Sequence, residues 1–266
     1  MKIAFTKISA TGNDFIVFDN RTNDLSAGRH HTWFQQICRR RLSIGADGVI
    51  LLESSSRADF RYIHINSDGN EAEMCGNGTR AISMFAFKNK IAGQNLKFEI
   101  NGSVYEASVA DTRVTTQFKT PNTPQFNLGI LSENNFEEGG FINTGVPHYV
   151  LFSRDIDKID VATQGAFYRH HKVFAPNGVN VNFAEVIDSH SLYVRTFERG
   201  VEGETMACGT GAVATAFFSI LKKNCSPPIT VQTRGGELVI NSTESLTDIT
   251  LSGTVNVVFE GLIDGP

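Results

Sequence analysis

The sequence predicts an α+β protein of two pseudo-symmetric halves, each a β-barrel-like sheet around a central buried helix. Three observations predict this fold class: a repeat of half the chain length, strand-like segments on both sides of one helix in each half, and helices that are apolar on nearly every face. A helix that is hydrophobic all round has to be buried on every side. A sheet wrapped around the helix provides that environment.

The repeat has an offset of 133 residues, half of the 266 in the chain. Four landmarks align at this offset without a gap. A single match would be weak evidence, but four matches in the same order are hard to ascribe to chance. The aligned pairs are Thr11–Phe18 with Thr144–Leu151, Asp59–Ser67 with Leu192–Gly200, Cys75–Gly78 with Cys208–Gly211, and Leu96–Gly102 with Ile229–Gly235. We therefore expect two structurally similar halves.

In the first half, the expected strands are rich in Val, Ile, Phe and Tyr, and one central helix separates them. The strands are Lys2–Ile8, Phe15–Asp19, Asp47–Glu53, Phe60–Asn66, Leu96–Ile100, Val104–Val109 and Val114–Lys119. The central helix is expected over Thr79–Lys90, where lysines in the last turn complement the negative end of the helix dipole. A short helix is expected over Thr32–Arg40.

The second half has the same order of elements around a central helix over Ala212–Lys223. Its expected strands are Tyr149–Ser153, Val179–Val186, Leu192–Glu198, Ile229–Thr233, Glu237–Ile240, Ile249–Leu251 and Val255–Glu260. Two prolines interrupt the strand pattern in Thr120–Pro124. We therefore expect an N-terminal half over residues 1–119 and a C-terminal half over residues 120–260.

Composition excludes several classes of protein. Hydrophobic residues make up 41% and charged residues 20%, which is enough apolar matter for a sizeable core and excludes disorder as the main state. The net charge is −4 and the basic residues are scattered, which argues against a nucleic-acid or anionic-membrane partner. Residues 1–15 lack a signal-peptide apolar region, and no run approaches the ~18 apolar residues of a membrane span. We expect a cytoplasmic protein that acts on a small molecule.

Two of the four cysteines open the central helices. Cys75 and Cys208 each precede a Gly-rich turn, where unpaired backbone N–H groups and the helix dipole bind anions. The dipole also stabilises a thiolate, so we expect thiol pKa values below the ~8.5 of a free cysteine. Cys38 and Cys225 have neither this context nor an equivalent in the other half, and are interpreted as small buried hydrophobes. The absence of CxxC spacing disfavours a disulfide scaffold or a structural zinc site.

The duplicated cysteines suit stereochemical inversion at one carbon. If the two halves face each other, one thiol lies on each side of a cleft. One sulfur then removes a proton from one face of the carbon while the other donates a proton to the opposite face. Backbone N–H groups at the helix starts meet the charge that develops on the adjoining carboxylate. This scheme requires neither a metal nor a pyridoxal cofactor.

Four segments give the chain a specific resemblance to the diaminopimelate epimerase family: Gly12–Phe15, Asn66–Arg80, Gly178–Phe183 and Glu198–Gly211. The resemblance extends over nearly the whole chain. It implies an isomerase that interconverts LL- and meso-2,6-diaminopimelate without pyridoxal phosphate, in lysine and peptidoglycan biosynthesis. It also implies two barrel domains with the active site in the cleft between them, the last residues (about 261–266) returning to the first domain, and it leaves a homodimer open.

The resemblance assigns roles motif by motif. Cys75 and Cys208 are the catalytic acid and base, His148 lies near them, and Arg199 suits the distal carboxylate through its bidentate fork. The implied substrate-binding residues are Asn13, Asn66, Gly76, Asn77, Asn182, Glu198, Arg199, Gly209 and Thr210, of which Gly76, Asn77, Gly209 and Thr210 hold the carboxylate at the reacting carbon.

Two positions depart from the family pattern. Val146 stands where the family often has Asn, and Gly48 stands where some members have a substrate-facing Gln. Neither change touches the acid–base chemistry, but both bear on which substrates the protein accepts.

Three interpretations remain open from the sequence. The first is a diaminopimelate epimerase, the second a related cofactor-independent racemase for another amino acid, and the third a thiol redox protein that pairs Cys75 with Cys208. The set formed by Asn66, Asn182 and Arg199 favours the first, because the far end of diaminopimelate must be held away from the thiols.

Overall fold

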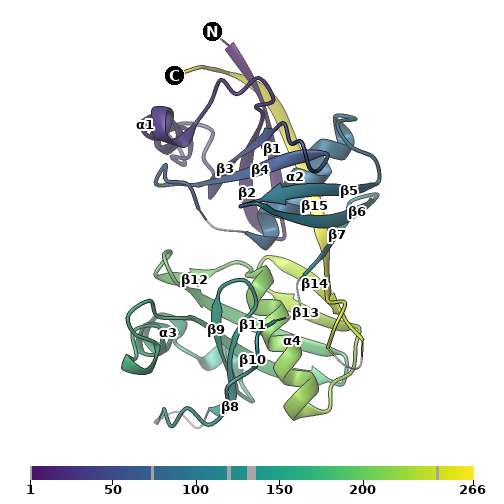
Figure 1. Ribbon diagram of the computed structural model, residues 1–266. Helices are drawn as coiled ribbons and strands as arrows, with labels where there is room; N and C mark the ends of the chain where they lie inside the picture. Colours follow the sequence, from purple (N-terminus) through teal and green to yellow (C-terminus); the bar gives the residue numbers. More distant parts are fainter. Residues whose placement is uncertain (1, 73–74, 119–120, 131–135, 244–245) are drawn as a thin grey trace. The chain divides into compact units, whose positions relative to one another are not determined.

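The computed structural model describes residues 2–72, 75–118, 121–130, 136–243 and 246–266, and the chain forms two compact units (Figure 1). Unit 1 comprises Met1–Gln117 and Gly253–Pro266, and unit 2 comprises Phe118–Ser252. The segment that returns to unit 1 begins earlier than the expected residue 261, because strand β15 (Thr250–Asp264) continues through this region without a break. Within the described ranges, no helix is both long and apolar enough to span a membrane.

Eight strands of unit 1 form a closed ring, because β15 pairs with both β7 and β1. In addition to β15, the ring contains β1 (Lys2–Ala10), β2 (Asn13–Asp19), β3 (Gly48–Glu53), β4 (Phe60–Asn66), β5 (Asn95–Ile100), β6 (Ser103–Ala110) and β7 (Arg113–Gln117). The antiparallel register of β1 with β15 runs from the Lys2–Asp264 pair to the Ala10–Val255 pair. Closure leaves no strand edge exposed along the ring.

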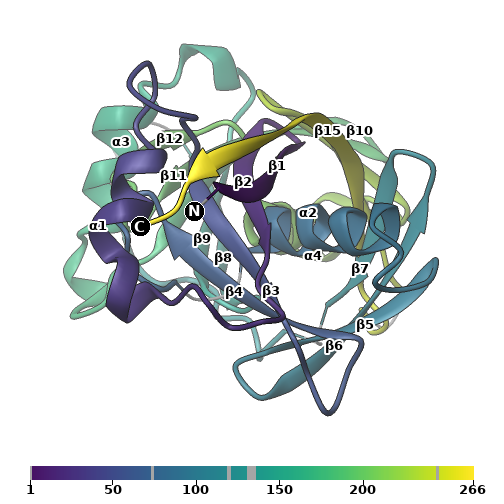
Figure 2. The same ribbon diagram turned by 90° about the horizontal axis from the view of Figure 1, so that it is seen from above.

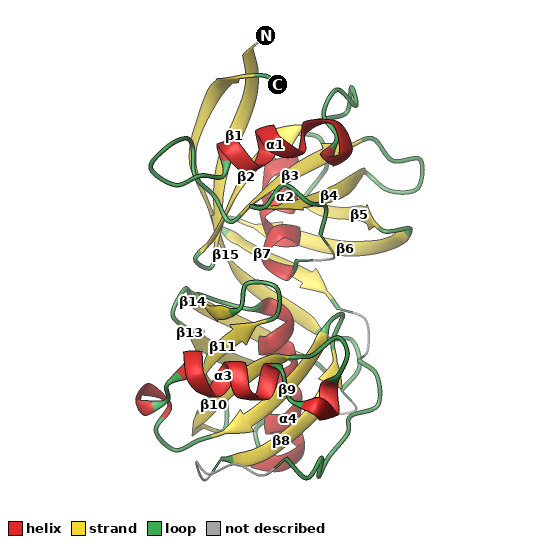
Figure 3. Cartoon of the chain, turned by 90° about the vertical axis from the view of Figure 1, so that its left-hand side faces the viewer, coloured by secondary structure: helices red, strands yellow, loops and turns green. Residues whose placement is uncertain are grey.

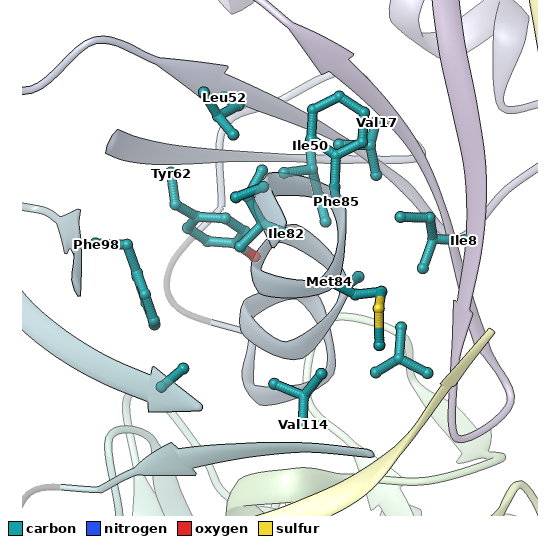
Figure 4. Packing of buried hydrophobic residues seen from close by; sticks show 14 of the residues in the cluster. Ile8, Val17, Ile50, Leu52, Tyr62, Ile82, Met84, Phe85, Phe98 and Val114 are labelled. Atoms are coloured by element: carbon teal, nitrogen blue, oxygen red, sulfur yellow. The ribbon is translucent and has the colours of Figure 1, made fainter. Parts of the chain in front are cut away.

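Helix α2 (Gly76–Lys88) lies inside this ring (Figure 2) and is buried from Gly76 to Ala86. Its apolar side chains contact side chains from the surrounding strands, as Figure 4 shows for Ile8, Val17, Ile50, Leu52, Tyr62, Ile82, Met84, Phe85, Phe98 and Val114. A second helix, α1 (Ala27–Ile37), packs Phe34 and Ile37 against a separate apolar cluster on the outside of the ring. The packing explains why α2 has no polar face.

Unit 2 has the same plan. Its elements are β8 (Glu137–Asn143), β9 (Pro147–Phe152), α3 (Val161–Arg169), β10 (Asn180–Asp188), β11 (Ser191–Glu198), β12 (Gly203–Thr205), α4 (Gly209–Lys223), β13 (Ile229–Thr233) and β14 (Gly236–Asn241), with 3₁₀ turns at Ile156–Lys158 and Lys172–Phe174. Helix α4 contacts six of these strands, and α3 packs on β10, β11 and β12. Figure 3 shows α2 and α4 within the sheets of their units and α1 and α3 outside them.

Strand pairing repeats between the units. Successive neighbours from β1 to β6 pair antiparallel, parallel, antiparallel, parallel and antiparallel. The series β8, β9, β10, β11, β13 and β14 pairs in the same alternation. The expected α+β architecture of two similar halves, each a barrel-like sheet around a central helix, is thereby confirmed.

The central helices begin three residues earlier than the predicted Thr79–Lys90 and Ala212–Lys223. The reason is that Cys75 and Cys208 are the N-cap residues, so the glycines that follow them already form the first helical turn. Helix α1 also begins and ends earlier than the predicted Thr32–Arg40, because its N-cap is Ser26.

Among the elements that were not predicted, strand β8 and helix α3 each contain a glycine in close contact. A Cβ at Gly140 in β8 would lie 2.6 Å from the Gln125 carbonyl oxygen, and one at Gly165 in α3 would collide with Phe197. These glycines weaken the local strand and helix patterns. The predicted strands Ile249–Leu251 and Val255–Glu260 are one strand, β15.

Candidate active site

Cys75 lies at the N-cap of α2 in unit 1. Its backbone is extended (φ −115°, ψ 116°), and its Sγ accepts a hydrogen bond from the Gly78 N–H at 3.4 Å. This position places the half-buried sulfur at the positive end of the helix dipole. A Cβ at Gly78 would collide with the Tyr62 hydroxyl, so the turn requires glycine there. Glu73 and Met74 of the same motif lie outside the described residues.

Polar side chains from β2 and α2 meet at this sulfur. The Cys75 thiol lies 3.7 Å from Asn13 Oδ1, and Asn77 Nδ2 donates to the same oxygen at 3.3 Å. Asn13 Nδ2 donates in turn to Asp47 Oδ2 at 2.7 Å, and Arg80 Nη2 donates to Asn77 Oδ1 at 2.7 Å. The structure therefore brings Asn13, Cys75 and Asn77 together, and adds Arg80 beneath them.

Asn66 is the exposed last residue of β4, opposite Gly48 at the start of β3. A Cβ at Gly48 would lie 2.8 Å from the Ile65 carbonyl oxygen and 2.9 Å from His64 Nε2. A side chain at position 48 would therefore require these neighbours to move. This close approach is a local physical reason why position 48, which departs from the family pattern, is a glycine.

Cys208 occupies the equivalent position in unit 2, 133 residues after Cys75, as the N-cap of α4 (φ −120°, ψ 111°). Its side chain is buried, and its Sγ lies 3.5 Å from Thr210 Oγ1. A Cβ at Gly211 would collide with Asn182 Oδ1, just as one at Gly78 would collide with a polar atom from the adjacent sheet. Gly209 and Thr210 form the first turn of the buried helix.

His148 reaches this thiol through Thr210. Burial, together with the charge of Arg199, lowers the pKa of His148 to about 3, so its ring is neutral near pH 7. Asn182 Nδ2 donates to His148 Nδ1 at 3.0 Å, which leaves the proton on Nε2, 2.9 Å from Thr210 Oγ1. Thr210 accepts that proton's hydrogen bond and can direct its own hydroxyl proton to Cys208.

Asn182 is fully buried. Its amide also donates to the Tyr149 carbonyl oxygen at 3.3 Å, and its Oδ1 accepts from Thr196 Oγ1 at 3.0 Å. These contacts hold Asn182 under the helix start, where it orients His148.

Sequence reasoning missed Asn180, two residues earlier on the same strand face. Its Oδ1 accepts from the Arg199 backbone N–H at 2.8 Å, and its Nδ2 donates to the Pro147 carbonyl oxygen at 3.0 Å. Arg199 and Glu198 are both partly exposed, and Glu198 Oε1 accepts from Thr205 Oγ1 at 2.6 Å. The alternation of side chains along Gly178–Phe183 was the available signal for Asn180.

Cys38 and Cys225 differ from the two helix-capping cysteines. Burial raises the pKa of Cys38 to about 12, and burial also raises the pKa of Cys225. Both side chains are therefore protonated near neutral pH, in agreement with their interpretation as buried apolar groups.

Comparison with known proteins identifies the family. Residues 5–122 and 140–258 match the model of the family described as diaminopimelate epimerase. The chain belongs to the diaminopimelate epimerase family. The diaminopimelate epimerase of Aquifex aeolicus is 39% identical over 269 residues, covering 97% of this chain and 96% of that protein. That of Chlorobaculum tepidum is 40% identical over 268 residues, covering 96% and 99%.

Solved structures share the fold at lower sequence identity. A phenazine biosynthesis protein of the PhzF family from Enterococcus faecalis superposes with a TM-score of 0.75 at 15% identity, covering 100% of both chains. A hydroxyproline epimerase from Agrobacterium vitis, with trans-4-hydroxy-L-proline bound, gives 0.68 at 14% identity, covering 98% of this chain and 92% of that one. Membership of the diaminopimelate epimerase family makes this protein an amino-acid isomerase.

Proposed function

We propose that this protein interconverts LL- and meso-2,6-diaminopimelate, with Cys75 and Cys208 as the two catalytic bases. One observation carries the mechanism: each unit places a cysteine at the N-cap of its buried central helix, at equivalent positions 133 residues apart. The name shared by its relatives, diaminopimelate epimerase, supports the substrate.

The proposed reaction exchanges one proton on the substrate. A thiolate takes the α-proton as the Cα–H bond breaks, and the electron pair delocalises into the adjoining carboxylate. The other thiol then protonates the opposite face of the carbon, so the two sulfurs exchange protonation states and the roles reverse in the other direction. Backbone N–H groups in the first turns of α2 and α4 stabilise the carboxylate as its charge grows.

This mechanism requires the two sulfurs to reach opposite faces of the same carbon, in a cleft between the halves. That arrangement is part of the proposal. Recognition of the distal end falls to Asn66, Glu198 and Arg199, since an exposed amide, a carboxylate and a guanidinium complement an amino-acid group. We infer that Asn182 positions His148, because its fully buried amide donates to His148 Nδ1, and the expected contact of Asn182 with substrate stays a prediction.

The test is solvent deuterium uptake with alanine variants of single cysteines. The wild-type protein should incorporate deuterium at the α-carbon of diaminopimelate, and Cys75→Ala or Cys208→Ala should slow epimerisation by about 10²–10⁴-fold, the usual loss for a general acid or base. Cys38→Ala and Cys225→Ala are matched controls that should retain activity. Full activity in either Cys75→Ala or Cys208→Ala would refute the two-base mechanism.

The same assay with glutamate and proline separates this proposal from a racemase of other substrates. Exchange into proline or glutamate at rates above that of diaminopimelate would reassign the substrate while leaving the thiol chemistry intact.

A further inference from the structure

Four side chains of unit 1 form one chain of hydrogen bonds that passes beside the Cys75 sulfur. Arg80 Nη2 donates to Asn77 Oδ1 at 2.7 Å, and Asn77 Nδ2 donates to Asn13 Oδ1 at 3.3 Å. Asn13 Nδ2 then donates to Asp47 Oδ2 at 2.7 Å. The Cys75 thiol donates to the same Asn13 oxygen, with sulfur and oxygen 3.7 Å apart.

The two ends of this chain fix the direction of the hydrogen bonds between them. A guanidinium can only donate, so Arg80 turns the oxygen of the Asn77 amide toward itself and leaves the Asn77 nitrogen facing Asn13. A carboxylate can only accept, so Asp47 turns the nitrogen of the Asn13 amide toward itself. If the Asn13 amide were reversed, its oxygen would face the Asp47 carboxylate and its nitrogen would face that of Asn77. Both hydrogen bonds of Asn13 within the chain would then be lost.

Asp47 is itself fixed by contacts between the starts of β2 and β3. Its Oδ2 also accepts from the Asp14 backbone N–H at 3.1 Å, and its own backbone N–H donates to the Asp14 carbonyl oxygen at 2.9 Å. Its Oδ1 accepts from Arg40 Nη2 at 2.8 Å, and Lys7 pairs with Asp14, so this cluster of two carboxylates and two cations is formally neutral. Since Asn13 is the first residue of β2, its amide lies against a well-supported carboxylate.

We propose that Asp47 is a positioning residue of the proposed reaction, which keeps the Asn13 oxygen directed at Cys75 and so favours the thiol of Cys75 over its thiolate. An amide oxygen accepts a hydrogen bond from a thiol, whereas it has no proton to offer a thiolate and repels its negative charge. The inference rests on the proposed function, because the proton that Asn13 helps Cys75 to retain is the one that Cys75 gives to substrate when it acts as the acid.

Other groups near Cys75 act in the opposite direction or carry no charge. The helix dipole and the Gly78 N–H, 3.4 Å from the sulfur, favour the thiolate, and so does the positive charge of Arg80 on the same helix. Burial, with the charge of Cys75 adding to it, raises the pKa of Tyr62 on β4 well above its usual value, so that phenol is neutral. His64 faces the Tyr62 ring with centroids 6.0 Å apart. These contributions remain when only the direction of the amide changes.

The test measures how fast Cys75 of the intact protein reacts with iodoacetamide as a function of pH, with peptide mass spectrometry to identify the site. Asp47→Asn keeps the shape of the side chain and permits either direction of the Asn13 amide. The Cys75 ionisation midpoint should therefore fall by about 0.5–1 pH unit, which corresponds to ~0.7–1.4 kcal/mol. Asn13→Ala removes the acceptor and should lower the midpoint by a similar amount. Cys225, buried in unit 2, should react slowly in every variant and reports on unfolding.

A double variant separates the direction of the amide from the charge that Asp47→Asn also removes. If Asp47 acts through the amide, adding Asp47→Asn to Asn13→Ala should not lower the Cys75 midpoint further. An equal shift in both backgrounds would overturn the inference, and so would an unchanged midpoint in a folded Asp47→Asn protein. If Asp47→Asn does not fold, Asp47→Ser takes its place in the comparison, and an unchanged midpoint in Asn13→Ala would overturn the inference by itself.

The pH profile of epimerisation provides a second readout. In the direction of reaction that uses Cys75 as the acid, the alkaline limb of the kcat/KM profile should move to lower pH by the same amount in Asp47→Asn. A lower kcat with an unmoved limb would reduce Asp47 to a structural role and overturn the inference. Absence of activity on diaminopimelate, with the midpoints as expected, would refute the proposed function and leave the role of Asp47 standing.

Discussion

Thr210 offers the sharpest test of how the environment of Cys208 is built. Its hydroxyl lies between a ring nitrogen of His148 at 2.9 Å and the Cys208 sulfur at 3.5 Å. The Asn182 amide fixes the His148 tautomer, so Thr210 accepts from the ring and donates to the sulfur. Thr210→Val removes both hydrogen bonds while it keeps the shape of the side chain.

Two separate effects should follow from Thr210→Val. The buried His148 Nε2–H loses its acceptor, which costs about 1–3 kcal/mol of unfolding free energy. The Cys208 thiolate loses a hydroxyl donor, and a hydrogen bond to a charged group contributes about 1.5–3 kcal/mol. At ~1.4 kcal/mol per pH unit, the second loss raises the Cys208 ionisation midpoint by about 1–2 units.

Urea unfolding measures the first effect, and pH-dependent alkylation of Cys208 measures the second. Thr210→Ser retains the hydroxyl and should preserve the Cys208 midpoint. An unfolding free energy and a Cys208 midpoint both equal to wild type in Thr210→Val would show that the hydroxyl does not link the imidazole to the sulfur.

Three further predictions concern pH, substrate recognition and specificity. The pKa of folded His148 is about 3, below its ordinary 6.5, so between these two pH values the unfolded chain binds one more proton than the folded protein. The free energy of unfolding therefore falls as pH falls, by up to ~1.4 kcal/mol per pH unit. Urea titrations of His148→Asn should show a weaker dependence of this free energy on pH, and an equal dependence would assign it to other groups. Arg199→Ala should lower kcat/KM for diaminopimelate by at least about 30-fold, because truncating one partner of a desolvated charge pair costs about 2–5 kcal/mol. Unchanged kinetics would mean that other residues recognise the distal end of the substrate. Val146→Asn should tighten diaminopimelate binding by about 1.5–3 kcal/mol if the added amide reaches a charged end, and an unchanged kcat/KM ratio of diaminopimelate to glutamate would mean that position 146 does not face substrate.

The fold could be predicted where the hydrophobic pattern of one half recurs in the other, and not where a glycine interrupts that pattern. Both central helices were identifiable because their apolar faces are continuous, and the 133-residue offset maps the whole of α2 onto α4, which is two residues longer. Helix α3 was missed because Gly165 lowers its helix propensity, although this glycine is what lets α3 approach Phe197. The repeat itself was a usable signal, since the helix expected in Thr32–Arg40 implies an equivalent one half a chain later.

The site was predictable in its backbone and less so in its buried polar contacts. Cysteine followed by glycines at a helix start is visible in sequence. Asn182 lies wholly under α4, whereas Asn180 holds the backbone of Arg199. This division depends on which amide lies beneath the helix start and which lies against the neighbouring turn. Strand alternation places both residues on one face and cannot separate them.

Similar backbones alone would not suffice for a two-base reaction. Each turnover needs one thiolate and one thiol, and two cysteines in identical surroundings would share the protonation states equally, so much of the protein would hold unproductive combinations. Both helix starts give the sulfur the same dipole, and both leave room for a polar group of the sheet only because Gly78 and Gly211 lack side chains. The difference between the two sulfurs therefore has to come from the side chains around each helix start, where the Cys75 thiol lies against the Asn13 amide oxygen and Cys208 lies against the Thr210 hydroxyl.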